Sequence, residues 1–307
     1  MPTFHPDLAV ARFIPRFSMS PRMIRLMRRP APRTTDDPHG GRIRDVHVPG
    51  NGASGASVRL YEPVDRVTPS PALLWIHGGG FLIGDPEQDR RSSIGFAREL
   101  GITVAAVRYR LAPEHPSPAA LEDAYAALIW LSANADALGI DPTRIAIGGA
   151  SAGGGLAAAL ALYAHDRGQV RPAFQLLVYP MLDDRTATRD DLPSRGVRMW
   201  TPESNRFAWT AYLGTEPGGD GVSPYAAPAR REDLSGLPPA WIGVGTNDLF
   251  HDEDVVYAGR LGEAGVPCDL HVVDGAFHGF DAVLPKAGVS RRFWQTQADA
   301  LRRALTP

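Results

Sequence analysis

The stretch from Arg144 to Gly155, RIAIGGASAGGG, determines how the chain is organised. It opens with a short apolar run, Ile145 to Ile147, which is typical of a buried strand. We expect the two glycines that follow to end this strand. Residues 156–164 are almost all good helix formers, so a helix should come next. The sequence therefore predicts a strand that turns sharply into a helix, with Ser151 at the corner.

Residues Gly149 to Gly153 fit the pattern G-x-S-x-G, in which a serine hydroxyl is exposed on a tight turn. Glycines are needed on both sides of Ser151 because neighbouring backbone crowds that corner. A serine hydroxyl is a poor nucleophile at neutral pH, so it needs a base and a carboxylate that orients the base. One match to this pattern is weak evidence for a catalytic serine in a chain with 32 glycines. The assignment of Ser151 as a nucleophile therefore depends on finding the base and the carboxylate.

The composition is that of an ordinary globular protein. Hydrophobic residues make up 44% and charged residues 21% of 307 residues, enough for one large α/β domain or two small ones. A net charge of −2 gives no reason to expect a nucleic-acid partner. Cys268 is the single cysteine, which excludes an intrachain disulfide.

The sequence contains no run of about 18 apolar residues, so we expect no transmembrane helix and no stable membrane insertion. The N-terminal residues lack the continuous apolar segment of a secretory signal, which favours a cytoplasmic location.

Strand and helix patterns alternate along most of the chain. Buried strands are predicted at 72–76, 102–107, 145–147, 174–179, 241–245 and 269–273. Helices are predicted at 90–100, 118–134, 156–164, 201–213, 254–264 and 291–304. Residues 42–48 and 57–61 should form an antiparallel pair at a sheet edge, joined by the turn PGNGASGA. This order predicts a doubly wound, mostly parallel sheet of about eight strands, with reactive groups at the carboxyl ends of its strands.

The segment His77 to Phe81, HGGGF, directly follows the predicted strand at 72–76. Three consecutive glycines leave their backbone N–H groups unobstructed, so these groups can point at an anion. The segment matches the HGGG-type loop that supplies amides to an oxyanion hole. We expect His77 itself to be a structural hydrogen-bonding group rather than a base.

The base is expected among nine histidines. His278 lies in a loop after the last predicted strand, between glycines, where backbone can approach a site closely. The other candidates lie at the approach to a helix, inside a strand and in a proline-fixed loop, namely His251, His271 and His115. We therefore predict that His278 is the base.

Asp248 is the predicted orienting acid because it directly follows a strand end. Asp252 is the alternative, but Asp252, Glu253 and Asp254 fall at a helix start, where the helix dipole alone explains carboxylates. The order Ser151, Asp248, His278 is the hydrolase order and differs from the two protease orders.

Together these segments resemble the hormone-sensitive-lipase-like group of α/β-hydrolases, the bacterial family IV carboxylesterases. The matching segments are HGGGF at 77–81, YRLAPEHP at 109–116, GASAGGG at 149–155, SPYAAP at 223–228, the Asp248 segment and FHGF at 277–280. Ala150 stands where the family often has Asp or Glu. Residues 248–253 read DLFHDE where the family often has DPLRDE.

The resemblance implies an α/β-hydrolase fold with a helical cap and an acyl-enzyme mechanism on short- to medium-chain esters. Ser151 would attack the ester carbonyl, with His278 as base and Asp248 as its orienting acid. The oxyanion would be bound by amides of Gly78 or Gly79, Gly80 and Ala152. No metal and no organic cofactor would be needed. An amidase or peptidase of the same fold, or a non-catalytic module that binds a small ligand, remains as an alternative.

Three segments follow from this assignment: an N-terminal cap arm at 1–41, a catalytic core at 42–181 and 238–307, and a cap insertion at 182–237. The aromatic residues of the insertion are either ordinary helix core or the wall of an acyl pocket. The predicted pocket residues are Phe81, Trp200, Phe207 and Trp209.

The apolar and arginine-rich residues 1–33 leave three interpretations open: an arm packed on the body, a membrane-surface helix or a flexible leader. Prolines should divide this segment into short helical pieces. We also expect a homodimer, because the last strand should lie near a sheet edge that needs covering.

Overall fold

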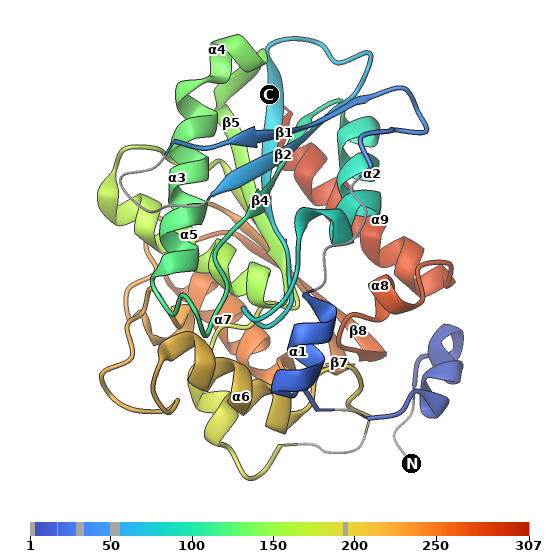
Figure 1. Ribbon diagram of the computed structural model, residues 1–307, viewed down its shortest axis with the longest axis vertical. Helices are drawn as coiled ribbons and strands as arrows, with labels where there is room; N and C mark the ends of the chain where they lie inside the picture. Colours follow the sequence, from blue (N-terminus) through green and yellow to red (C-terminus); the bar gives the residue numbers. More distant parts are fainter. Residues whose placement is uncertain (1–3, 17, 29–33, 50–55, 193–195, 307) are drawn as a thin grey trace.

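The computed structural model describes residues 4–16, 18–28, 34–49, 56–192 and 196–306 (Figure 1). In these residues one eight-stranded sheet has the strand order β1-β2-β4-β3-β5-β6-β7-β8. β2 pairs antiparallel with both β1 and β4, and the remaining neighbours are parallel. The strands are β1 (Arg42–His47), β2 (Ser57–Glu62), β3 (Ser70–Ile76), β4 (Thr103–Arg108), β5 (Ile140–Ala150), β6 (Phe174–Val178), β7 (Ala240–Asn247) and β8 (Cys268–Phe277). The predicted mostly parallel α/β sheet and its antiparallel edge are confirmed.

Helices cover both faces of the sheet, as a doubly wound fold requires (Figure 1). α2 (Arg90–Leu100) and α9 (Gly288–Leu305) share one apolar cluster with the sheet. α3 (Ala119–Ala133), α5 (Ala152–Arg167) and α7 (His251–Glu263) share a second cluster on the opposite face. The other helical elements of the described residues are η1 (Pro6–Phe13), α1 (Pro21–Met27), η2 (Pro86–Asp89), α4 (Ala135–Leu138), η3 (Asp184–Thr188), α6 (Pro202–Leu213), η4 (Pro228–Arg230) and α8 (Phe280–Val283).

The strand β5 continues past the point where the sequence predicted its end. Gly148 and Gly149 stay in the ladder, opposite Trp75 and Ile76 of β3, and β5 ends at Ala150. A Cβ atom on Gly149 would lie 2.5 Å from the Ile76 carbonyl oxygen. The glycines therefore permit a close approach of backbone within the sheet and do not terminate the strand.

Other helix boundaries agree closely with the sequence. Thr201 caps α6, and its hydroxyl accepts the Ser204 N–H, as predicted. Pro118 is the N-cap of α3 and not part of its first turn. α7 begins at His251, three residues earlier than predicted, so Asp252 to Asp254 still occupy its first turn. Most of the predicted turn PGNGASGA lies at 50–55, outside the described residues.

The described part of the N-terminal segment packs on the body of the molecule (Figure 1). Leu8, Ala11, Met19 and Ile24 are buried. The Asp7 carboxylate accepts the Val289 N–H of α9 at 2.8 Å. Other side chains of the segment remain outside this contact: Val10, Phe13, Leu26 and Met27 are at least half exposed, Phe13 most of all at 75%. No helix in the described ranges is both long enough and apolar enough to cross a membrane.

Two acids in the first turn of α7 are buried, which the sequence did not indicate. The Glu253 carboxylate accepts the Leu182 N–H at 2.7 Å and the Thr186 hydroxyl, and burial raises the pKa of Glu253 to about 8. Asp254 is fully buried, and neither of its carboxyl oxygens has a hydrogen-bond partner in the described chain. Burial first, and then the charges of Glu253 and Asp248, raise the pKa of Asp254 well above its usual value of 3.8.

The Asp254→Asn variant should make stability less dependent on pH. Folded Asp254 keeps its proton above pH 4, whereas the unfolded chain releases it, so the unfolding free energy falls as pH rises. One proton held only in the folded state lowers the unfolding free energy by about 1.4 kcal/mol for each unit of pH. Urea unfolding at about pH 5 and about pH 8 should show a smaller decrease for the variant than for the original chain. Equal decreases in the two proteins would show that Asp254 is ionised in the folded state.

Candidate active site

Ser151, His278 and Asp248 form one hydrogen-bonded chain. His278 Nε2 lies 2.8 Å from Ser151 Oγ, and His278 Nδ1 lies 2.8 Å from Asp248 Oδ2. Each side chain follows the carboxyl end of a parallel strand: Ser151 follows β5, Asp248 follows β7 and His278 follows β8. The sheet therefore brings together three residues that are up to 127 positions apart in the sequence.

The backbone at Ser151 is held in an uncommon conformation, with φ 58° and ψ −124°. The Ser151 N–H donates to the Val178 carbonyl oxygen at 2.9 Å, and its own carbonyl accepts N–H groups of Gly155 and Met181. A positive φ at a non-glycine residue costs about 1–3 kcal/mol, so these contacts must maintain the turn. A Cβ atom on Gly153 would lie 2.1 Å from the Ile76 carbonyl oxygen, which explains the glycine after the serine.

The imidazole of His278 is held on several sides. The rings of Tyr179 and Phe250 meet it edge-on at centroid distances of 4.8 Å and 5.1 Å. The Asp248 carboxylate also accepts the Phe250 N–H at 3.0 Å, which fixes the acid. The contact of His278 Nδ1 with the Asp248 carboxylate assigns the imidazole proton to Nδ1, which leaves Nε2 to accept from the Ser151 hydroxyl.

The HGGG loop lies directly beside Ser151. A Cβ atom on Gly78 would lie 2.8 Å from the Ala150 carbonyl oxygen and 3.4 Å from Ser151 Cβ. Gly79 and Gly80 have φ values of 120° and 61°, which favour glycine. The hydrogen bonds of the described residues include none donated by the backbone N–H of Gly79, Gly80 or Ala152. Ala152 also begins α5, whose N-terminus favours negative charge.

His77 is placed as a structural residue, as the sequence predicted. Its side chain is 1% exposed, and Nδ1 lies 2.8 Å from the Gly78 carbonyl oxygen. The ring stacks on Tyr109 at 4.3 Å, and the Tyr109 hydroxyl donates to the His77 carbonyl. Burial lowers the pKa of His77 to about 4, so its imidazole is neutral and helps to fix the loop.

The alternative histidines and acids lie outside this chain of hydrogen bonds. His251 Nδ1 lies 3.0 Å from Asp252, and Asp252 also pairs with Arg189 at the surface. His271 lies in β8 and stacks on Trp241. The geometry therefore favours Asp248 over Asp252 as the partner of His278.

The four predicted pocket residues occupy different positions. Trp200 packs directly on Gly80, and its ring centroid lies 6.4 Å from that of His278. Phe81 stacks on Tyr212 at 3.8 Å, and both Phe81 and Trp209 are at most 1% exposed, which favours ordinary core packing for these two. Phe207 is half-buried in α6.

The sequence did not indicate Tyr179, although it contacts His278. Its hydroxyl donates to Asp281 Oδ1 at 2.9 Å, and its backbone has φ 36°. The sequence feature that could have indicated a site residue is its position directly after the buried strand β6 and before Pro180.

Comparison with known proteins gives a consistent result. The family described as having the alpha/beta hydrolase fold matches residues 73–282. Carboxylic ester hydrolase LipN of Mycobacterium tuberculosis is 36% identical over 270 residues, covering 86% of this chain and 71% of that protein. Ethyl acetate hydrolase of Pseudomonas putida is 34% identical over 241 residues, covering 78% of this chain and 75% of that protein.

Solved structures agree. A bacterial heroin esterase superposes with a TM-score of 0.90 at 40% identity, covering 100% of this chain and 99% of that one. Esterase LipW from Mycobacterium marinum superposes with a TM-score of 0.80 at 41% identity, covering 88% of this chain and 84% of that one. The chain therefore belongs to the α/β hydrolase fold family, among relatives that are carboxylic ester hydrolases.

Proposed function

We propose that this protein is a serine carboxylesterase that hydrolyses short- to medium-chain acyl esters. The observation that carries the proposal is the hydrogen-bonded chain Ser151–His278–Asp248 beside unpaired backbone amides. The esterase names of its relatives support the reaction class. A serine with both a base and backbone donors can carry out acyl transfer without any further group.

The reaction follows from the geometry. Ser151 Oγ attacks the ester carbonyl carbon while His278 Nε2 takes its proton and Asp248 stabilises the resulting imidazolium. The N–H groups of Gly79, or of Gly78, with those of Gly80 and Ala152 receive the negative oxygen. Collapse breaks the bond to the alcohol oxygen, which leaves with the proton from His278. Water then attacks the acyl carbon of the acyl-enzyme while His278 Nε2 takes a proton from it. Collapse breaks the bond to Ser151 Oγ, which takes that proton back from His278, and the carboxylic acid is released.

We assign residues 42–181 and 238–307 to the catalytic core, and the arm at 1–41 and the insertion at 182–237 to one cap. Two contacts support a shared cap: the Met19 N–H donates to Ser204 Oγ at 2.9 Å, and the hydroxyls of Ser18 and Thr201 lie 3.1 Å apart. α1 and α6 accordingly lie at the same end of the molecule (Figure 1). Trp200 of the insertion covers Gly80, so the cap would form a wall of the acyl site.

Replacing the proposed nucleophile or base should abolish ester hydrolysis. Ser151→Ala and His278→Ala should each lose roughly four to six orders of magnitude in kcat, because the two groups act as a unit. His251→Ala is the control and should keep most of its activity. The measurement is turnover of p-nitrophenyl esters of graded chain length and of the matching anilides. Faster anilide than ester hydrolysis would assign an amidase, and ester turnover by pure Ser151→Ala would exclude Ser151.

The two acids in this region give an independent test. Asp248→Asn should reduce kcat by about 10⁴, because the wrong tautomer of His278 is favoured. Asp252→Asn should leave kcat nearly unchanged, since Asp252 bonds to His251 at the surface. A larger loss in Asp252→Asn than in Asp248→Asn would reverse this assignment.

Deleting residues 1–33 should destabilise the protein and alter its acyl-length preference while leaving the triad in place. Each large side chain lost from burial, such as Met19 or Ile24, contributes roughly 1.5–3 kcal/mol. The melting temperature should therefore fall by roughly 10 °C. Phe13→Ala, which changes an exposed residue of the same arm, is the control. An unchanged melting temperature and an unchanged profile would contradict a cap role.

We also propose that a second copy of this chain covers the edge strand β8. β8 is the last strand of the sheet, and its Leu270 and Val272 are 38% and 40% exposed. An apolar edge of this kind favours pairing with another chain. Light scattering at micromolar concentration should give about twice the chain mass of 33.1 kDa. A monomer mass there would reject the dimer.

A further inference from the structure

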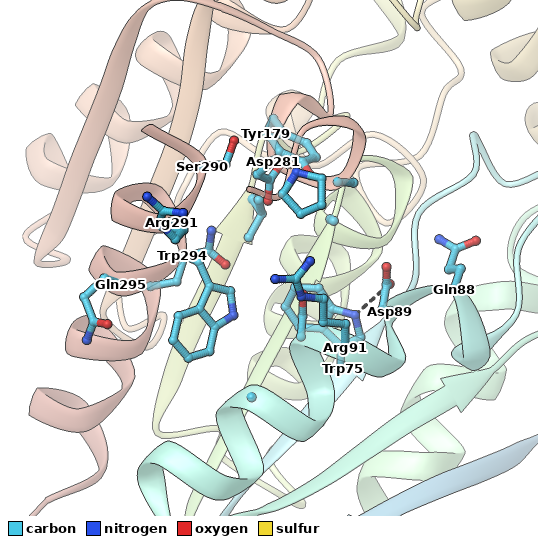
Figure 2. Close-up of a pocket in the computed structure, with 17 residues that line it drawn as sticks. Trp75, Gln88, Asp89, Arg91, Tyr179, Asp281, Ser290, Arg291, Trp294 and Gln295 are labelled. Atoms are coloured by element: carbon cyan, nitrogen blue, oxygen red, sulfur yellow. Dashed lines mark hydrogen bonds between the residues drawn. The ribbon is translucent and has the colours of Figure 1, made fainter. Parts of the chain in front are cut away.

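A cavity of about 470 Å³ lies on the α2 and α9 side of the sheet, between α2, α8 and α9 (Figure 2). We call it the rear pocket. Its walls include Trp75, Asp89, Tyr179, Asp281, Ser290 and Trp294. Ser151 is not among the lining residues, although the adjacent Ala150 is. The rear pocket is therefore separate from Ser151 but lies next to the candidate active site, on the α2 and α9 side of the sheet.

Two carboxyl groups line the rear pocket, and both are labelled in Figure 2. Trp75 Nε1 donates to Asp89 Oδ2 at 2.9 Å, and the Tyr179 hydroxyl donates to Asp281 Oδ1 at 2.9 Å. Burial, with the charge of Asp281 adding to it, raises the pKa of Asp89 to about 6. Burial likewise raises the pKa of Asp281. Two nearby carboxylates with poor solvation disfavour each other's charge, so a positive group between them would stabilise both.

Polar atoms without partners also line the rear pocket. Ser290 and Gln297 are 2% and 3% exposed, and Ser290 Oγ and Gln297 Nε2 have no hydrogen-bond partner in the described part of the chain. A buried polar atom left unpaired costs about 1–3 kcal/mol. A ligand with polar hydrogens could donate a hydrogen bond to Ser290 Oγ. An acceptor atom on the same ligand could accept a hydrogen bond from Gln297 Nε2. These two unpaired atoms are a second indication, independent of the two acids, that the rear pocket binds a ligand.

The indole rings of Trp75 and Trp294 give the rear pocket its apolar walls. Trp294 is held in place by stacking on Phe96 at 5.1 Å. Indole faces attract cations as well as flat apolar groups. Arg91 and Arg291 also line the pocket, but both are exposed, so solvent screens their charge more than that of the two carboxylates.

We propose that the rear pocket binds a small organic cation, with an ammonium or guanidinium group between Asp89 and Asp281 and an apolar body against the two indoles. The two carboxylates would repel an anion, and a neutral ligand would leave their negative charges uncompensated. A bare metal ion fits poorly, because the described residues contain no group of three or more side chains able to ligate one. The volume of about 470 Å³ lies within the range of small-molecule pockets.

The test compares a charged probe with its neutral counterpart on the full chain. Benzylammonium and benzyl alcohol are titrated by calorimetry at about pH 8, where Asp89 is ionised. Saturable binding of benzylammonium, at least about tenfold tighter than that of the alcohol, is expected. Equal affinities, or no saturable binding up to about 10 mM, would overturn the proposal.

Variants then locate the site. Asp89→Asn should weaken benzylammonium binding about tenfold, whereas Asp136→Asn, an exposed acid on α4, should leave it unchanged. Lowering the pH to about 5 should weaken binding in the original chain, because Asp89 then takes up a proton. If Asp89→Asn fails to fold, the two probes and this pH dependence still decide the question.

A last experiment distinguishes binding in the rear pocket from binding in the ester site. Modification of Ser151 by a phosphonate fills the ester site, and benzylammonium affinity should remain within about twofold of its original value. Loss of binding after modification would place the cation beside Ser151 and contradict the rear pocket. This experiment requires Ser151 to react, as the proposed function assumes, whereas the calorimetric comparison of the two probes and of Asp89→Asn needs no reaction and so can fail or succeed independently of the proposed function.

Discussion

The close approach of three backbone segments, where β3, β5 and α5 meet, is the constraint on which the site depends. A Cβ atom on Gly153 would lie 2.1 Å from the Ile76 carbonyl oxygen and 2.5 Å from that of His77. A Cβ atom on Gly149 would lie 2.4 Å from the Gly153 carbonyl oxygen. Any side chain at these two positions would push the helix away from the sheet. The contact places Ser151 beside the HGGG loop, so one packing constraint positions both the proposed nucleophile and the proposed oxyanion donors.

The second requirement is a fixed orientation for His278. Its two nitrogens are engaged by Ser151 and Asp248, and the rings of Tyr179 and Phe250 limit its tilt. Tyr179 also connects this imidazole to Asp281, a wall residue of the rear pocket. The surroundings of His278 thus extend to the α2 and α9 side of the sheet, where Ala150, the residue before Ser151, also lines the rear pocket.

Much of this arrangement follows from the sequence, for physical reasons. Continuous apolar runs mark buried parallel strands, and side chains that follow their carboxyl ends gather at one edge of the sheet, so the sequence predicts that Ser151, Asp248 and His278 meet there, as they do. Gly148 and Gly149 were misjudged because a glycine required by packing has the same local signature as one that ends a strand. The burial of Glu253 and Asp254 was hidden, because acids in a first helical turn are normally solvated. The rear pocket joins α2 to α9, a contact between segments about 200 residues apart, which local patterns do not reveal.

The proposed mechanism requires Ser151 to carry the acyl group during turnover. Acid quenching of the enzyme within milliseconds of mixing with p-nitrophenyl acetate, followed by intact-protein and peptide mass spectrometry, tests this directly. The protein should gain one acetyl group, located on the peptide that contains Ser151. Turnover of the ester with no acylated peptide, or with the acetyl group on another residue, would contradict it.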